Sequence, residues 1–190
     1  MPTVSVPAVI DPASGGDKAF RRLLYDLGSA AAYLEVARAY LASRIGVTSP
    51  QYNMMMIIAQ SEDALGISIN DIADQLNVSN TFVTMELKKL DQRGLIVKSP
   101  NPADARSVLV CLSAEGERQI ESLAPEFLRV NDRLFEHITA RDFQSLARIV
   151  ASLIGDFSRT AAMLETIQRQ EALQASRDRV RGSARGAGKQ

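Results

Sequence analysis

Residues 68–112 contain the pattern that most constrains the fold of this chain: two short helical segments, a tight turn between them, and two strand-like segments. Ser68 and Asp71 resemble a capping box with Asp in place of the usual Glu, which predicts the start of the first helix. Ser79 follows the turn and can cap a second helix, which the pattern extends to about Arg93. Gly94 stands where a helix typically ends.

After Gly94 the apolar pattern changes from helical spacing to the alternation of strands. Residues 95–98 predict a short strand, residues 99–105 with their two prolines predict a loop, and residues 107–112 predict a second strand. Two short helices joined by a tight turn and followed by a β-hairpin describe a winged helix-turn-helix. In such a unit the second helix lies in the major groove of DNA.

Longer helices are expected on both sides of this unit. Apolar residues at helical spacing predict one helix over residues 17–43, and another that Ser49 caps with Pro50 at its first position. Ser113 caps a later helix that Pro125 should kink or restart, and Thr139 begins the last one. We therefore expect a mainly α fold with a two-stranded β wing: a winged helix-turn-helix over residues 47–115, long flanking helices over residues 17–46 and 116–172, a flexible N-terminal arm over residues 1–16 and a basic flexible tail over residues 173–190.

The formal net charge of zero is a sum of unlike segments. Lys and Arg together number 22, as do Asp and Glu. Residues 1–46 carry a net charge of +1, residues 79–106 carry +2 and residues 177–190 carry +4, whereas residues 47–78 carry −4 and residues 107–176 carry −3. The balance therefore does not argue against nucleic acid as a partner, but any affinity must rest on a few well-placed cations.

Composition and motifs exclude several other classes of protein. One cysteine and one histidine, far apart in sequence, argue against a disulfide framework and a zinc site, and a single thiol fits a reducing compartment. No apolar run approaches the roughly eighteen residues of a transmembrane helix, and the N-terminus lacks the basic region of a secretory signal. No catalytic triad, metal-ligand spacing or glycine-rich phosphate loop is present. We expect a cytoplasmic protein that is not an enzyme, uses no cofactor or metal, and has no membrane partner.

The second helix of the unit has two different faces on a wheel of about 100° per residue. Val83, Leu87 and Leu90 form an apolar stripe that predicts its buried side. The opposite side carries donors, acceptors, methyl groups and two cations, so we predict that this helix reads DNA through Ser79, Asn80, Thr81, Thr84, Met85, Lys88 and Lys89. An ordinary solvated face is the alternative that these residues alone leave open.

The expected hairpin adds candidate contacts at its tip and on its first strand. Asp104 stands two residues before Arg106 and can pair with it, which would aim the guanidinium along the hairpin. An Arg in that place is well positioned for a narrow minor groove, and Lys98 lies on the first strand. The alternative is a surface ion pair worth about 0–1 kcal/mol.

Several segments resemble the MarR family of transcriptional regulators, and the resemblance covers about residues 20–165. The most specific segment is the wing, in which Asp104 and Arg106 precede an alternating strand and Leu112-Ser113 leads to Gly116 in the next helix. The other similar segments are residues 49–52, 76–79 and 90–96.

This resemblance implies a homodimer on a pseudo-palindromic operator, with the first helix and the last two helices forming the dimer interface. It implies that Arg106 enters the minor groove and that Asp104 orients it. It also implies control by a small molecule bound near the junction of the dimerisation and DNA-binding regions. The expected function is therefore a sequence-specific regulator, a repressor released by a small aromatic, phenolic or carboxylated effector, with double-stranded DNA and its own second copy as partners.

The sequence departs from the family pattern at a few positions. The family wing often reads Asp-Pro-x-Asp-Arg-Arg, whereas Asn101 and Ala105 stand here in place of the first Asp and the first Arg. Met85 stands where the family often has a basic residue. Fewer cations imply a weaker salt dependence of DNA binding and more apolar contacts with bases.

The family architecture also suggests which residues could bind an effector. Arg38, Tyr40 and Tyr52 lie where a junction pocket is expected, and they could hold a carboxylate and an aromatic ring. Met54 and Met55 could supply an adaptable apolar wall to the same pocket. Ordinary core packing is the alternative for these methionines.

Two further hypotheses come from other classes of mechanism. Cys111 lies on the strand face opposite Val110 and is expected to be exposed, so a thiol-switched or constitutive DNA-binding protein is one alternative. No histidine neighbours Cys111 in sequence, and a passive cysteine is the simpler interpretation. His137 is expected to be satisfied or solvent-facing. The other alternative is a winged-helix protein that contacts only other proteins.

Overall fold

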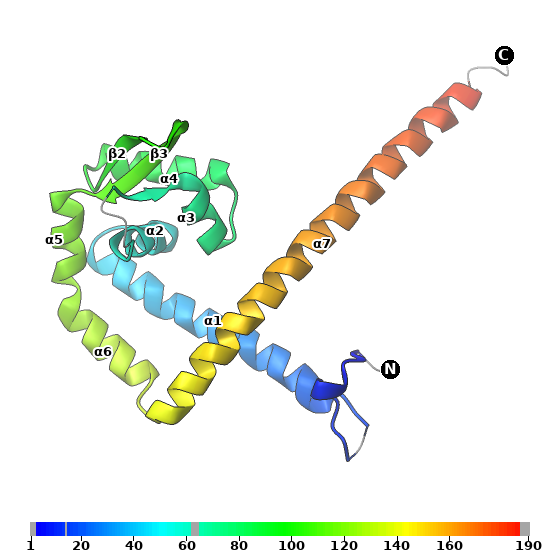
Figure 1. Cartoon of the computed structure of the whole chain (residues 1–190), viewed down its shortest axis with the longest axis horizontal. Helices are drawn as coiled ribbons and strands as arrows, with labels where there is room; N and C mark the ends of the chain where they lie inside the picture. The colour runs from blue at the N-terminus through cyan, green and yellow to red at the C-terminus, as the bar shows by residue number, and fades with distance from the viewer. Residues whose placement is uncertain (1–2, 14, 62–64, 187–190) are drawn as a thin grey trace. The chain divides into compact units, whose positions relative to one another are not determined.

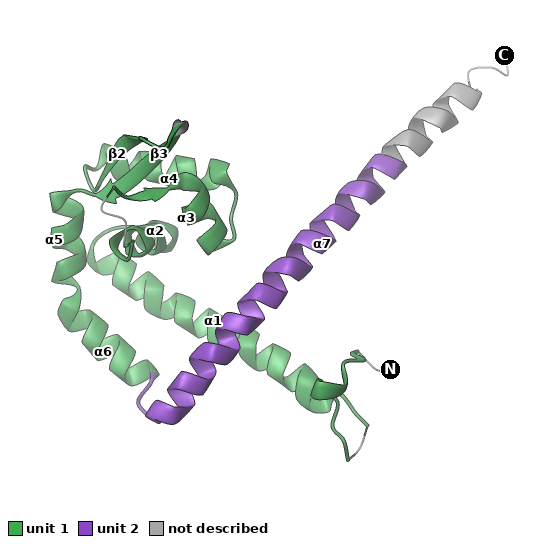
Figure 2. Cartoon of the chain, viewed as in Figure 1, with its two compact units in different colours: residues 1–134 green, residues 135–190 purple. Residues whose placement is uncertain are grey.

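The computed structural model describes residues 3–13, 15–61 and 65–186, and for residues 105–106 and 175–186 it describes the backbone alone. The chain forms two compact units, residues 1–134 and residues 135–190 (Figure 2). Its mainly α architecture confirms the expected fold class. The elements in order are η1 Pro7–Val9, α1 Lys18–Arg44, α2 Ser49–Ala59, β1 Ile67–Ser68, α3 Ile69–Leu76, α4 Asn80–Gln92, β2 Ile96–Asn101, β3 Asp104–Leu112, α5 Ala114–Ser122, α6 Ala124–Leu134 and α7 Ala140–Gly186 (Figure 1).

Side-chain caps fix most of the helix starts that the sequence predicts. The hydroxyls of Ser68, Ser79 and Ser113 each accept a hydrogen bond from a backbone N–H in the first turn of α3, α4 and α5. The prediction that Ser49 caps α2 is wrong, because Thr48 is the cap. Thr48 and Gln51 form a capping box in which each side chain accepts from the backbone N–H of the other, so Ser49 becomes the first helical residue.

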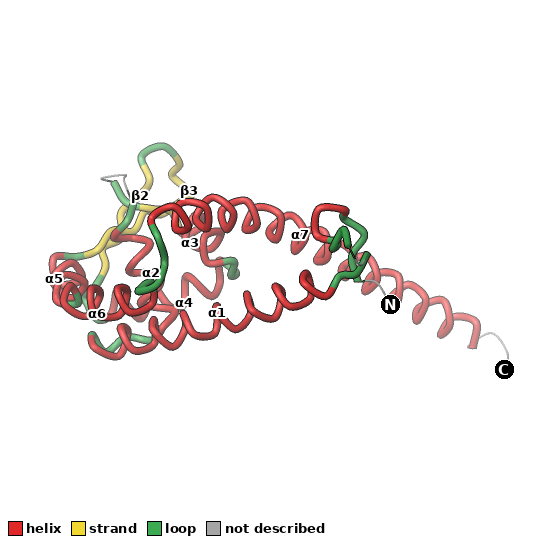
Figure 3. Tube along the Cα trace, turned by 90° about the horizontal axis from the view of Figure 1, so that it is seen from below, coloured by secondary structure: helices red, strands yellow, loops and turns green. Residues whose placement is uncertain are grey.

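The sheet has one strand more than the sequence predicts. Its order is β1-β3-β2 and both pairings are antiparallel. Figure 3 shows the strand segments in yellow, with β2 and β3 labelled. The short strand β1 was missed because Ile67 and Ser68 are too few to show an alternating pattern, and Ser68 also caps α3. The wing strands also extend into the expected loop, since Pro100 lies on β2, an edge strand that tolerates a missing N–H.

The core of the first unit lies under the helix pair α3–α4. Val83, Leu87 and Leu90 of α4 are fully buried, as the wheel predicted. They join one cluster with residues of α2 and the sheet. At Gly116 in α5, an added Cβ would lie 2.1 Å from the carbonyl oxygen of Leu95, so only glycine allows α5 to approach the start of the wing this closely.

The N-terminal arm is attached to the first helix rather than free along its whole length. It contains the short helix η1, and the backbone N–H of Thr3 donates to Asp17 Oδ2 at 2.6 Å. The Thr3 hydroxyl donates to the same oxygen, and these two hydrogen bonds hold the pKa of Asp17 below its usual value. The carboxylate at the start of α1 thus ties the arm down, which the sequence prediction of a flexible arm did not foresee.

The second unit consists of the turn after α6 and the long helix α7. The Thr139 hydroxyl donates to Asp142 and accepts from its backbone N–H, which confirms the predicted start. The helix continues to Gly186, beyond the end expected near residue 172. Residues 173–186 contain no proline and four arginines, which favour helix, so the polarity of this segment did not end the helix. Residues 187–190 of the predicted tail lie outside the described part of the chain. Within that part, no helix is both long and apolar enough to cross a membrane.

Candidate nucleic-acid interface

The helix α4 and its cap expose to solvent all the residues that the sequence assigned to base reading on this helix. The residues at its start and on its outer face are all exposed: Ser79, Asn80, Thr81, Thr84, Met85, Lys88 and Lys89. Met85 is 52% exposed, although it is a large apolar side chain that would normally be buried. The face is therefore uncharged near its start and cationic only near its end.

Two of the hydroxyls on this face already make hydrogen bonds within the helix. Ser79 Oγ accepts from the backbone N–H of Phe82 at 3.2 Å, as a cap does. Thr84 Oγ1 donates to the carbonyl of Asn80 at 2.8 Å. Because its proton is used in this way, the Thr84 side chain offers a base edge a methyl group and an acceptor oxygen.

The predicted cations near the face differ in their partners. Lys89 Nζ lies 2.5 Å from Glu86 Oε1, and Lys98 Nζ on β2 lies 3.1 Å from Asp91 Oδ2 on α4. Among the residues that the structure describes, Lys88 forms no ion pair and its side chain is exposed. Two of the three lysines assigned to DNA therefore have a carboxylate of α4 as a partner.

Glu86 is the residue of this region that sequence reasoning missed. It is only 7% exposed, and its Oε2 accepts from Gln51 Nε2 of α2 at 2.8 Å. Its hydrogen bond with Lys89 holds the pKa of Glu86 below its usual value, although burial opposes this. The lowered pKa means that the charged pair stabilises the fold above the ordinary pKa of glutamate, and this contribution is lost as the pH falls through the lowered value.

Arg93, at the end of α4, contacts the turn between α1 and α2. Its Nη1 donates to the carbonyl of Gly46 at 2.8 Å, and its Nη2 donates to that of Ile45 at 3.4 Å. These carbonyls belong to the end of α1, where a cation also interacts favourably with the helix dipole. The helix α4 is thus attached to α2 through Glu86 and to the turn before α2 through Arg93.

The wing projects from the sheet as the hairpin β2–β3. Its tip is ordered by Asn101, whose Oδ1 accepts from the backbone N–H of Ala103 and whose Nδ2 donates to Ser107 Oγ at 2.8 Å. Asp104 begins β3 and Arg106 follows on the same strand. The side chain of Arg106 lies outside the described part of the structure, so its pairing with Asp104 stays a prediction.

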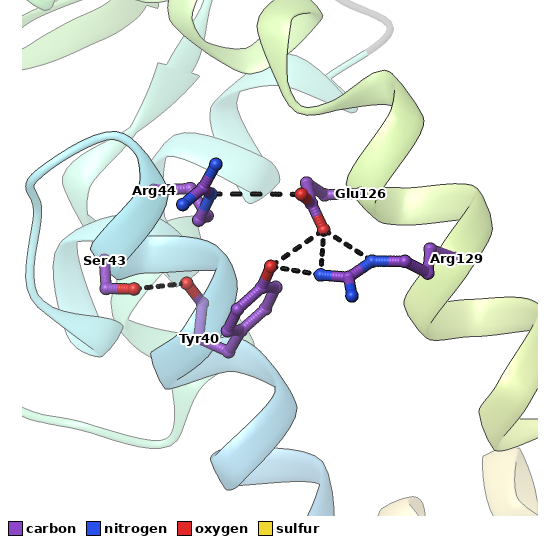
Figure 4. Close-up of polar contacts among 5 residues, drawn as sticks. All are labelled: Tyr40, Ser43, Arg44, Glu126 and Arg129. Carbon is purple, nitrogen blue, oxygen red and sulfur yellow. Dashed lines mark hydrogen bonds and ion pairs between the residues drawn. The ribbon is translucent and has the colours of Figure 1, made fainter.

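A polar cluster joins α1 to α6 (Figure 4). The Tyr40 hydroxyl donates to Glu126 Oε2 at 2.9 Å, and Arg129 donates to the same oxygen from Nε at 3.0 Å. The Arg129 guanidinium also contacts the Tyr40 hydroxyl and lies 5.3 Å from the centre of its ring. The hydrogen bond from Arg129, and to a smaller extent that from Tyr40, holds the pKa of Glu126 below its usual value.

Among the predicted effector residues, Arg38 lies near Tyr52, but Tyr40 has other neighbours. Tyr40 faces α6, whereas Arg38, two positions earlier on α1, is exposed and lies 3.8 Å from Glu35. Tyr52, Met54 and Met55 are buried in the core, and burial raises the pKa of Tyr52 although the nearby Arg38 opposes the shift. Residues two apart on a helix point about 200° apart, which is why one pocket cannot contain both Arg38 and Tyr40.

Tyr40 instead lines a shallow pocket of about 390 Å³. Its other lining residues come from α6: Arg129, Val130, Arg133 and Leu134. The pocket therefore combines an aromatic ring, an apolar wall and two guanidinium side chains.

The surroundings of Cys111 and His137 indicate neither a catalytic nor a metal-binding role. Cys111 is half-buried rather than openly exposed, because it lines a pocket of about 400 Å³ between α2 and α5 and lies close to Gly66. His137 is exposed in the turn before α7, as expected. Within the described residues, no group of His, Cys, Asp and Glu side chains could hold a metal ion.

The helix pair α3–α4 and the wing β2–β3 define a winged helix-turn-helix protein. The model of the MarR family matches residues 47–108, the part of the chain that contains the winged helix-turn-helix. Among curated relatives, the Bacillus subtilis regulator YwhA is 31% identical over 86 residues, which are 45% of this chain and 62% of the relative. The chain spans less than two thirds of the length of the first such relatives.

Solved structures share the fold at lower sequence identity. A mutant of E. coli MarR in complex with operator DNA is 21% identical with a TM-score of 0.59, and covers 70% of this chain and 93% of its own. CouR from Rhodococcus jostii, bound to p-coumaroyl-CoA, is 21% identical with a TM-score of 0.60, and covers 69% and 88%.

Proposed function

We propose that the protein is a sequence-specific DNA-binding transcriptional regulator and not an enzyme. The observation that carries this proposal is the outer face of α4, where the methyl, amide and hydroxyl groups of Asn80, Thr84 and Met85 are exposed over a fully buried apolar stripe. Such groups suit base edges and thymine methyls in the major groove. The match to the MarR-family model and a neighbour solved with operator DNA support the same function.

The active form in this proposal is a homodimer. In the single chain, α1 and α7 expose many large apolar residues that a soluble surface rarely carries in such density: Leu23, Leu24, Tyr33, Leu34, Phe143, Leu146, Ile149, Ile154, Phe157, Leu164 and Ile167. A second copy would cover them. The dimer would place its two recognition helices about 34 Å apart, one turn of DNA, on a pseudo-palindromic operator.

A mobility-shift titration with the DNA flanking the protein's own gene tests the function. The expected result is specific retardation that persists when scrambled competitor DNA is added. If the protein retards no such duplex, the regulator hypothesis fails and the winged helix serves protein contacts instead. An oxidant response that is unchanged in Cys111→Ser would exclude thiol switching.

Changes on the two halves of the α4 face should separate base reading from phosphate binding. Thr84→Ala or Met85→Ala should change the preferred sequence with little effect on the salt dependence. Lys88→Ala should weaken all sequences alike and reduce the slope of log K against log salt by about 0.9 for each recognition helix. Binding isotherms on a panel of duplexes at several salt concentrations would measure both effects. The assignment of Met85 to base reading is wrong if Met85→Ala changes only the slope of log K against log salt.

The finer proposal is a repressor released by a small aromatic or carboxylated effector. The pocket beside Tyr40 supports it, because Arg133 can attract a carboxylate and Tyr40 can stack on a ring. The neighbour CouR binds an aromatic thioester, p-coumaroyl-CoA. An effector at this pocket would contact α1 and α6 together, and DNA and effector would weaken each other's binding equally.

A hydroxybenzoate should bind this pocket and release the DNA. Arg133→Ala should weaken that binding about tenfold, the value of a lost charge-assisted hydrogen bond, and leave the DNA affinity without ligand unchanged. Calorimetry with the purified protein measures the first quantity and a mobility shift measures the second. Arg118→Ala, on α5, is a matched control that should change neither, and equal losses in both variants would contradict the pocket assignment.

A further inference from the structure

The charge of Lys89 is held by a buried carboxylate of the same helix. Lys89 Nζ lies 2.5 Å from Glu86 Oε1, and the Lys89 side chain is 58% exposed while that of Glu86 is 9% exposed. An ion pair with one desolvated partner is screened less by salt than a pair on the open surface. Lys89 therefore lies on the DNA-reading face with most of its charge neutralised by the buried carboxylate of Glu86.

Glu86 itself is fixed by a chain of hydrogen bonds that begins at the start of α2. The backbone N–H of Thr48 donates to Gln51 Oε1 at 3.2 Å, and Gln51 Nε2 donates to Glu86 Oε2 at 2.8 Å. Both oxygens of the carboxylate are thus occupied, one by Gln51 and one by Lys89. The carboxylate cannot turn away from Lys89 without leaving the amide of Gln51 unpaired, which is costly at a buried position.

We infer that Glu86 is a specificity-determining residue that limits the attraction of the recognition helix for DNA of any sequence. It does so by keeping Lys89 paired and in one position, so that binding depends on the base-reading side chains near the start of α4. The inference rests on the proposed DNA-binding function. It goes beyond that function because Glu86 touches no DNA group itself and acts through Lys89 as a positioning residue.

A second ion pair, between α4 and the wing, should also limit the affinity for DNA of any sequence. Asp91, also on α4, lies 3.1 Å from the ammonium of Lys98 on the wing. Sequence-independent affinity comes from cations that displace counterions from phosphates, and a lysine that already has a carboxylate partner displaces fewer. Of the lysines assigned to DNA, Lys88 is the one without an ion-pair partner among the described residues, so it should dominate the salt dependence.

The variant Glu86→Gln tests this inference in the full-length protein. Glutamine keeps an oxygen for Gln51 but releases Lys89. With a scrambled duplex, affinity at low salt should rise about fivefold, and the slope of log K against log salt should steepen by about 0.9 for each recognition helix. The ratio of operator to scrambled affinity should fall, since a freed lysine can reach a phosphate in any register.

Three variants separate the inference from simpler effects. Adding Lys89→Ala to Glu86→Gln should restore the wild-type slope, and Lys89→Ala alone should change the slope less than Lys88→Ala does. Glu121→Gln, at an exposed position of α5, removes the same charge and should have no effect. A thermal melt of Glu86→Gln confirms that the variant is folded.

The inference is overturned if Glu86→Gln leaves the slope unchanged, if Glu121→Gln reproduces the change, or if the change persists without Lys89. These results leave the proposed function intact, because they compare proteins that bind DNA. A wild-type protein that retards no duplex would overturn the proposed function, and this inference with it.

Discussion

Replacing Arg106 with alanine is expected to weaken binding to the operator by about thirtyfold or more and to leave the fold and the dimer intact. An arginine in a narrow minor groove or at a base edge contributes about 1–3 kcal/mol, and a dimer inserts two of them. Arg106 lies on β3 directly after the tip of the wing. Because its proposed role is to contact DNA, the loss should appear in DNA binding alone.

Fluorescence anisotropy with an operator duplex measures this loss, and circular dichroism checks the fold. Arg118→Ala is the matched control, because Arg118 is an exposed arginine of α5 that pairs with Glu115. It should change the affinity less than threefold, as expected for a residue that does not contact the DNA. Wild-type affinity in Arg106→Ala would refute the assignment of the wing as a minor-groove reader.

The other large effect is expected at the dimer interface. Phe157→Asp should convert the protein to monomers at micromolar concentration and abolish operator binding. Phe157 is 52% exposed in the single chain, so the change should lower the free energy of unfolding of the monomer only slightly. In a dimer it would place a charge and its symmetry mate in an apolar interface, which is far more costly than the loss of the ring alone.

Ser152→Asp provides the control on the same helix. Ser152 is exposed and lies about 140° around α7 from Phe157, on the polar side. It introduces the same charge and should leave a dimer that binds DNA. Analytical ultracentrifugation measures the oligomeric state of both variants. A dimeric Phe157→Asp protein would show that this face of α7 is not the interface.

Local signals in the sequence predicted the parts of the structure that depend on local physics. The serines that cap α3, α4 and α5 were identified correctly, since a hydroxyl followed by helical spacing needs no tertiary information. The two faces of α4 were also predicted, because a helical period fixes which side chains share a side.

Features that depend on distant residues were missed. The pair of Gln51 with Glu86 joins positions 35 apart, and no pattern within either helix shows it. The spacing of Glu86 and Lys89 by three residues was a signal for their ion pair, but the burial of Glu86 could not be foreseen from it. The effector residues were assigned by family architecture, and the structure places Tyr40 against Glu126, 86 positions away.

Enrichment of random duplexes by the full-length protein tests whether α4 reads bases in a two-fold symmetric operator. A dimer that reads bases through α4 should enrich a pseudo-palindrome whose half-sites are centred about ten base pairs apart, one turn of DNA. Met85→Ala should then enrich a different half-site, whereas Lys88→Ala should enrich the same one more weakly. Recovery of unrelated sequences without two-fold symmetry would contradict the account, as would the same half-site from wild-type and Met85→Ala protein.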